Sequence, residues 1–185
     1  MLYFTERSQW RSWLSRNHRK ESEAWLVNAK KTSGKKRIPY NDAVEEALCF
    51  NWIDSINKTL DADHAMQRYT PRRAISSFSQ PNIERLRWLD SNGMIHPDYA
   101  EMVKELIHKE YIFPSDILDQ LKKEALVWDN FQNFKGGYQR IRIAYIDASR
   151  DRPEEFSKRL ERFIQYTRNN LQIPGYGGIE KYYNL

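Results

Sequence analysis

The sequence predicts an α+β fold, with a small antiparallel or mixed sheet and helices in the N-terminal half and a helical C-terminal half. Before residue 75 the apolar residues occur mostly in short runs bounded by turn residues, whereas from Asn82 onward they recur at helical spacing. Hydrophobic residues make up 40% of the 185 residues and aromatic residues 14%, which is enough to bury a core. One domain of ordinary size is therefore expected.

A helix and a strand are expected first. Residues 6–16 place two tryptophans and a leucine at helical spacing, and Thr5 is the expected N-cap. Residues 23–31 form an apolar run that stops at the turn residues 32–34, which predicts a strand buried on both sides.

A second helix and a hairpin follow. The helix is expected to begin at Asn41, as its N-cap, and to end near Phe50. Acidic residues favour its positive end: Asp42, Glu45 and Glu46. Residues 52–60 and 64–70 are short extended runs separated by three turn residues, which predicts an antiparallel hairpin.

The C-terminal half reads as a helical bundle or cap, in which Ser115 is an expected N-cap. We expect one domain over residues 1–170, with an α/β part at 1–80 and a helical part at 81–170. Helices are predicted in six segments: 82–91, 97–109, 115–123, 125–134, 138–149 and 154–170.

A tail rich in glycine and tyrosine occupies residues 171–185. Its glycines break regular structure, while Tyr176, Tyr182 and Tyr183 would expose apolar surface if they stayed in solvent. We expect these rings to pack on their own domain. Docking on a partner chain, or disorder, are the alternatives.

The composition indicates a cytoplasmic protein. The lone Cys49 cannot form an internal disulfide, and its place on an apolar helix face predicts a structural thiol. Residues 1–15 lack the apolar core of a signal peptide, and no run approaches the ~18 apolar residues of a membrane helix. Without a long heptad pattern, a monomer or weak dimer is expected.

The net charge of +5 is concentrated in residues 19–37. Such a cluster attracts phosphates, nucleic acid or an acidic protein surface, or is simply a solvated loop. Because no nucleic-acid-binding motif accompanies the charge, we expect no nucleic-acid binding. The basic loop is defined by Lys30, Lys31, Lys35, Lys36 and Arg37.

Strong catalytic and cofactor motifs are missing from the sequence, including zinc-protease, nucleophile-elbow and phosphate-loop patterns. The histidines, His18, His64, His96 and His108, are scattered. We therefore assign no catalytic residue and expect no cofactor and no metal site.

Three motifs carry a resemblance to a known family. They are residues 46–54, which include Asn51-Trp52-Ile53-Asp54, together with residues 68–72 and 77–82. The chain resembles the YdeI/OmpD-associated, or bacteriocin-protection, family of bacterial proteins. It departs from that family at Asn51, where glycine is usual, and at Phe78, where tryptophan is common. The resemblance implies protection against bacteriocins or antimicrobial peptides.

The motif residues also suggest a candidate ligand site. Trp52 and Asp54 share one face of a strand, and a cross-strand pair of Asp54 with Arg68 is feasible. Arg72 follows the hairpin, and Ser77, Ser79 and Asn82 can cap the next helix, whose free N–H groups attract anions. The expected ligand site comprises Trp52, Asp54, Arg68, Arg72, Ser79 and Asn82. The alternative is an architectural salt bridge with a helix cap.

Two functions follow from this site. The first is a non-catalytic binding or stress-protection module for a small anionic ligand or a peptide. The second is an unrecognised enzyme on a small anionic substrate, with Asp54 as the acid–base group and Arg68 and Arg72 as the substrate clamp.

Overall fold

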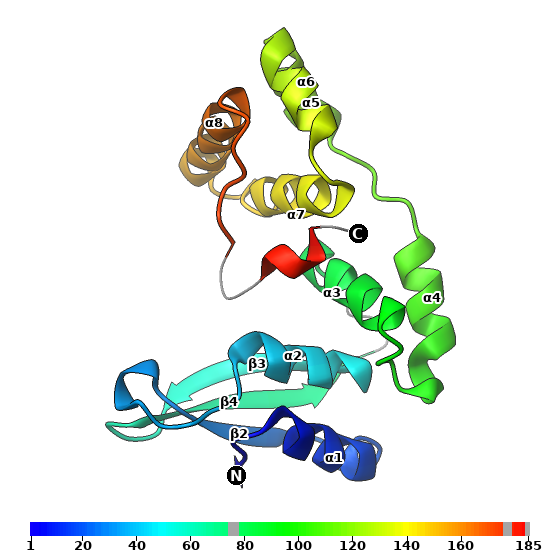
Figure 1. Cartoon of the computed structure of the whole chain (residues 1–185), viewed down its shortest axis with the longest axis vertical. Coiled ribbons are helices and arrows are strands. Elements are labelled where there is room, and N and C mark those ends of the chain that lie inside the picture. The colour runs from blue at the N-terminus through cyan, green and yellow to red at the C-terminus, as the bar shows by residue number, and fades with distance from the viewer. Residues whose placement is uncertain (74–77, 176–178, 184–185) are drawn as a thin grey trace. The chain divides into compact units, whose positions relative to one another are not determined.

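The fold is α+β, as predicted. The computed structural model describes residues 1–73, 78–175 and 179–183, and this part of the chain contains eight α-helices and a four-stranded mixed sheet. The strands all precede residue 72, and the second half is helical (Figure 1). No helix in these ranges is long and apolar enough to cross a membrane.

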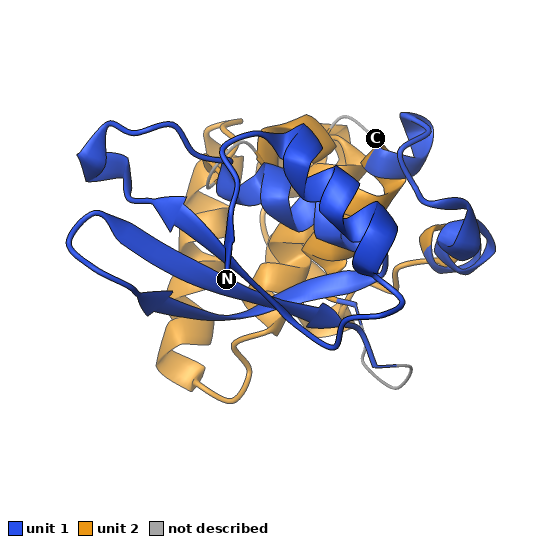
Figure 2. Ribbon diagram, turned by 90° about the horizontal axis from the view of Figure 1, so that it is seen from below, with its two compact units in different colours: residues 1–78, 89–106 blue, residues 79–88, 107–185 orange. Residues whose placement is uncertain are grey.

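The chain forms two compact units, each built from two separate stretches of sequence (Figure 2). The first unit comprises residues 1–78 and 89–106, and the second comprises residues 79–88 and 107–185. The first boundary between them lies just before α3 (Gln80–Ser91), the second inside α3, and the third inside α4 (Ala100–His108).

The sheet of the first unit has the strand order β1-β2-β4-β3. The expected hairpin is confirmed, because β3 and β4 pair antiparallel, and β4 also pairs antiparallel with β2. The parallel strand β1 was not predicted, because a strand of two residues is too short to show an alternating apolar pattern. The strands are β1 (Leu2–Tyr3), β2 (Ala24–Ala29), β3 (Trp52–Thr59) and β4 (His64–Pro71).

Aromatic rings bury one face of this sheet. Tyr69 on β4 lies directly opposite Asp54 on β3, so both side chains point to the same face. Trp10 of α1 (Arg7–Asn17) packs on Tyr69 with ring centroids 5.2 Å apart, and Trp13 packs on Trp52 at 5.8 Å. Helix α1 therefore covers the face that carries Trp52 and Asp54.

The helices start at other residues than expected. Helix α1 is capped by Glu6, not Thr5, because Glu6 and Gln9 bond to each other's backbone in a capping box. Helix α2 (Tyr40–Cys49) begins after Pro39, whose fixed φ suits that position, so Asn41 lies inside the helix. Helix α5 (Ser115–Lys122) likewise begins after a proline, Pro114, so Ser115 is its first residue and not the N-cap that we expected.

Glu45 and Glu46, which we expected to favour the positive end of α2, are both fully buried, which the sequence did not predict. Nε of Arg7 donates to Glu46 at 2.5 Å, and its Nη1 donates to Glu45 at 2.8 Å. Arg11 donates to the second oxygen of Glu46 at 2.7 Å. Burial alone lowers the pKa of Arg7, but bonding to the two carboxylates outweighs burial and raises it. These four charged residues thus form an ion-pair network between α1 and α2.

The second unit is helical, with its own apolar core. Tyr182 and Tyr183 are buried in that core, so the expected packing of the tail is confirmed for them, while Tyr176 lies outside the described residues. Besides the part of α3 before Leu89, the last two residues of α4 and the whole of α5, its elements are α6 (Ala125–Asn133), α7 (Gly136–Asp147), α8 (Pro153–Arg168) and the short helix η3 (Ile179–Tyr182).

Asn51, which connects α2 to β3, has a left-handed backbone with φ of +56°. Asparagine and glycine tolerate this region, whereas a Cβ-bearing apolar residue is strained there. We expect Asn51→Ala to lower the free energy of unfolding by about 1 kcal/mol, and Asn51→Gly to lower it by less. Urea unfolding of both variants checks this, and an equal loss in the two would contradict the backbone argument.

Candidate functional site

Trp52 of the expected ligand site is a core residue. Its side chain is fully buried, and its Nε1 donates to the backbone oxygen of His18 at 3.1 Å. Its ring meets Trp13 edge-on. The polar atom is therefore already bonded within the fold, and the ring stabilises the packing of α1 on the sheet.

Asp54 and Arg68 do not form the cross-strand pair that we expected. Because Asp54 is opposite Tyr69, the adjacent Arg68 points to the other face of the sheet. Each has another partner: Tyr40 donates its hydroxyl to Asp54 at 2.7 Å, and Arg68 donates to Glu23 at 2.7 Å. An Asp54–Arg68 site would require side chains that the sheet separates.

The other expected site residues that the structure describes form contacts within the fold, at the end of β4 and at the start of α3. Arg72 places its guanidinium 3.7 Å from the ring centre of Phe78, and its backbone N–H donates to Asn51 at 2.9 Å. Ser79 and Asn82 belong to the second unit, where the Ser79 carbonyl accepts the N–H of Asn82 at 2.9 Å at the start of α3. Ser77 lies outside the described residues.

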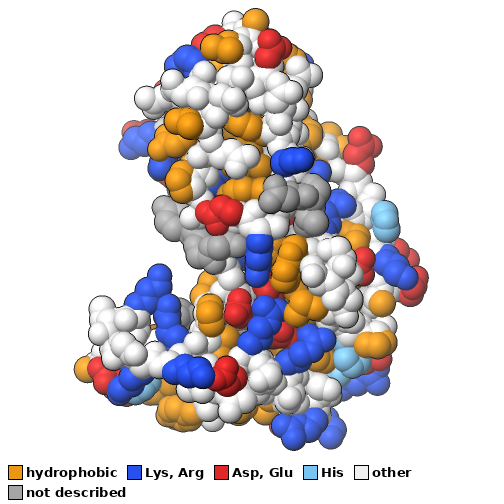
Figure 3. Space-filling model, viewed as in Figure 1, with side chains coloured by type: hydrophobic (Ala, Val, Ile, Leu, Met, Phe, Trp, Pro, Cys, Tyr) orange, Lys and Arg blue, Asp and Glu red, His pale blue; other side chains and the backbone are white. Residues whose placement is uncertain are grey.

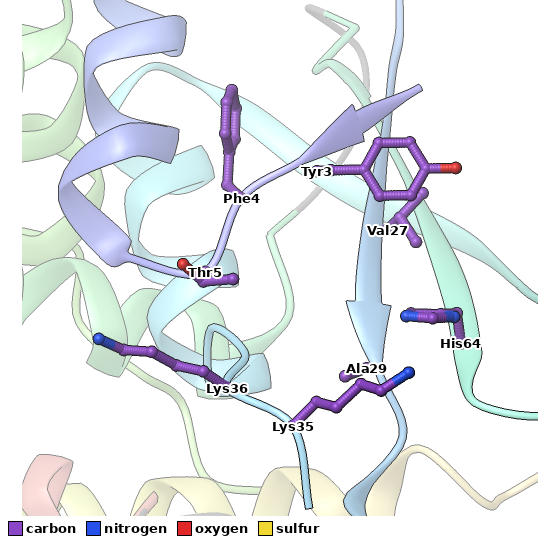
Figure 4. A pocket seen from close by; sticks show the side chains of 8 residues that line it. All are labelled: Tyr3, Phe4, Thr5, Val27, Ala29, Lys35, Lys36 and His64. Atoms are coloured by element: carbon purple, nitrogen blue, oxygen red, sulfur yellow. The ribbon is translucent and has the colours of Figure 1, made fainter. Parts of the chain in front are cut away.

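A pocket of about 260 Å³ opens elsewhere on the first unit, at the sheet face that also carries Arg68. Val27 and Ala29 of β2 are its buried apolar residues. Lys35 and His64 extend toward each other over Ala29, whereas Lys36 extends the other way (Figure 4). The full lining is Tyr3, Phe4, Thr5, Val27, Ala29, Lys35, Lys36 and His64.

The cations of this pocket are paired with acidic side chains from neighbouring loops. Lys35 donates to Asp63 at 2.7 Å, which raises the pKa of Lys35 and lowers that of Asp63. Lys36 pairs with Glu6. These contacts hold both lysine side chains at the rim, where an incoming anion can exchange with an exposed carboxylate.

The sequence indicated only part of this pocket. Lys35 and Lys36 belong to the predicted basic loop. Figure 3 shows lysine and arginine side chains exposed in the lower part of the view, where the strands lie in Figure 1. Lys30 instead donates to the backbone of Asp61 at 2.8 Å. His64 begins β4, but nothing in the sequence connects it to the loop or to the short strand β1.

Two family models match successive parts of the chain. A family described as "Domain of unknown function (DUF8412)" matches residues 2–102, more than half of the chain. A second family, "Bacteriocin-protection, YdeI or OmpD-Associated", matches residues 110–170. The chain therefore belongs to the DUF8412 family and carries a YdeI/OmpD-associated domain in its C-terminal part. No curated protein and no solved structure matches it.

The predicted resemblance to the YdeI/OmpD-associated family is confirmed over residues 110–170, which are not the residues that suggested it. The motifs at 46–54, 68–72 and 77–82 all lie within the part matched by the DUF8412 family. The YdeI/OmpD-associated match begins beyond them, in the helical second unit.

Proposed function

We propose that this protein is a non-catalytic binding module, which holds a small carboxylate or phosphate, or the acidic side chain of a peptide, in the pocket at Lys35, Lys36 and His64. The observation that carries the proposal is the pocket itself, where buried Val27 and Ala29 adjoin two exposed lysines. An apolar wall beside cationic groups suits a small organic anion.

We further propose that the module serves stress protection in the cytoplasm. The description of the YdeI/OmpD-associated family, which names bacteriocin protection, supports the first part. The lone Cys49 supports the second, because it is a free thiol and a reducing compartment suits a chain that forms no internal disulfide.

The enzyme hypothesis is less well supported. It needs Asp54 and Arg68 to face one substrate, and the strand register points them to opposite faces. The Asp54 carboxylate also accepts a hydrogen bond from the Tyr40 hydroxyl, and Trp52 is buried in the core.

Calorimetric titration with inorganic phosphate and with a small dicarboxylate tests the binding proposal. We expect the double variant Lys35→Ala/Lys36→Ala to lose at least about tenfold in affinity, because the charges that attract the anion are removed. Wild-type binding should also weaken as salt is raised, since exposed charges are screened.

Lys122→Ala is the matched control, because Lys122 is likewise exposed and paired with an aspartate, at 3.5 Å from Asp119. It should leave the affinity unchanged. Equal affinity of the wild type and the double variant, or no binding of either anion by the wild type, would contradict the proposal.

A further inference from the structure

Two histidines and an aspartate that are distant in sequence meet in the first unit. His18 directly follows α1, and His96 and Asp98 belong to the turn at the short helix η2 (Pro97–Tyr99). Nε2 of His18 lies 3.5 Å from Oδ2 of Asp98, and Nδ1 of His96 lies 3.4 Å from the same oxygen. One potential ligand atom from each residue lies within 4.8 Å of the other two.

His18 is the buried member of this group, and its side chain is only 6% exposed. Its Nδ1 lies 2.9 Å from the backbone oxygen of Leu14. Because a carbonyl only accepts, Nδ1 carries the proton, and in the neutral ring Nε2 has a free lone pair. Within the described part of the chain this Nε2 is buried and has no hydrogen-bond partner. A histidine ligand that donates its other N–H to a backbone carbonyl is held in this way in metal sites.

We propose that His18, His96 and Asp98 form a binding site for a divalent transition metal ion such as Zn²⁺. Zinc binds imidazole nitrogen and carboxylate oxygen at about 2.0–2.2 Å, so two ligands of a tetrahedral ion lie about 3.3–3.5 Å apart. The two distances from Asp98 Oδ2 match that separation. Three protein ligands leave one position for water.

The surroundings of His96 agree with a ligand role. The ring of His96 packs on the ring of His18 with centroids 4.9 Å apart, and Nδ1 of His96 faces Asp98. Its Nδ1 accepts a long hydrogen bond of 3.3 Å from the backbone N–H of Asp98, which metal binding would replace. The ring of Phe50 lies 5.2 Å from His18 and 5.0 Å from His96, which gives the group an apolar wall.

Arg19 is the natural competitor of a metal ion at this site. Its Nη2 lies 2.5 Å from Oδ2 of Asp98, but its side chain is 69% exposed and can turn into solvent. Arg11 adds positive charge near His96. A protonated His18 paired with Asp98 is the competing explanation of the cluster, and it predicts no metal binding.

The test is a calorimetric titration of the full chain, first stripped by a chelator, with Zn²⁺, followed by Co²⁺ as a spectroscopic probe. We expect one ion per chain and a tetrahedral Co²⁺ absorption band. His96→Ala and Asp98→Asn should each weaken Zn²⁺ binding by about 100-fold or more, since loss even of an outer partner of a ligand costs 10–100-fold. Both residues are partly exposed, so these variants should fold even if substitution of His18 prevents folding.

His64→Ala and His108→Ala are the controls, because these histidines lie outside the group, and both should bind Zn²⁺ as the wild type does. Arg19→Ala should bind it more tightly, because the competing cation is gone. The proposal is overturned if the wild type shows no saturable binding, if His96→Ala and Asp98→Asn retain full affinity, or if His64→Ala is the variant that loses it.

Discussion

Arg7→Met should lower the free energy of unfolding by about 3–5 kcal/mol, because two buried carboxylates lose the guanidinium that bonds to both, and Arg11 still pairs with Glu46 alone. Arg7 bonds to both Glu45 and Glu46, whose side chains are 0% and 1% exposed. Methionine keeps much of the volume of the arginine stem, so the loss reports mainly on the charge. Equilibrium urea unfolding, followed by tryptophan fluorescence, measures it.

Arg16→Met is the matched control on the same helix, because Arg16 is exposed and bonds only to the backbone of Ser12 at 3.1 Å. It should change stability by less than about 0.5 kcal/mol. Adding Glu45→Gln to Arg7→Met should recover part of the loss, since one stranded charge is then removed. Equal losses for Arg7→Met and Arg16→Met would show that the network does not stabilise the first unit.

Gly137→Ala should lower the stability of the second unit by several kcal/mol, because there is no room for a side chain. A Cβ at Gly137 would lie 2.4 Å from the backbone oxygen of Tyr182 and 3.1 Å from that of Tyr183. The tail would have to move away, and its two rings, 0% and 3% exposed, would leave the core. Removing a buried aromatic side chain costs about 3–5 kcal/mol. Thermal unfolding and limited proteolysis of the tail measure the effect.

Gly136→Ala is the control, one position earlier in α7. Its Cβ would meet only a side chain and no backbone: the guanidinium of Arg140, at 2.9 Å from Nη1, the nitrogen that does not bond to Glu84. Deleting residues 174–185 should lower the melting temperature as Gly137→Ala does. An unchanged melting temperature and a protease-resistant tail in Gly137→Ala would contradict the docking of Tyr182 and Tyr183.

The sequence predicted the elements of this fold better than their contacts. Apolar spacing located the helices and the hairpin, because a helix or strand that buries one face repeats its apolar residues at a fixed period. The burial of Glu45 and Glu46 escaped prediction because their partner Arg7 lies on another helix. The composition of α2 alone suggests only a favourable interaction with its positive end.

The candidate ligand site was harder to predict, because it depends on strand register. Alternation shows that Trp52 and Asp54 share a face, but a shift of one residue in pairing moves Arg68 to the other face. The pocket at Lys35 also needs β1, which is too short to detect. The proximity of His18 and His96 could not be predicted either, because it depends on how the 77 intervening residues fold back.

Anion binding at the pocket is the central claim, and an NMR titration of the isotope-labelled, metal-free protein with inorganic phosphate tests it most directly. We expect the backbone amide shifts to change at residues 3–5, at Lys35 and Lys36 and at His64, and these changes to disappear in Lys35→Ala/Lys36→Ala. Absence of saturable shifts, or shifts that instead cluster at Asp54 and Arg72, would contradict the proposed site.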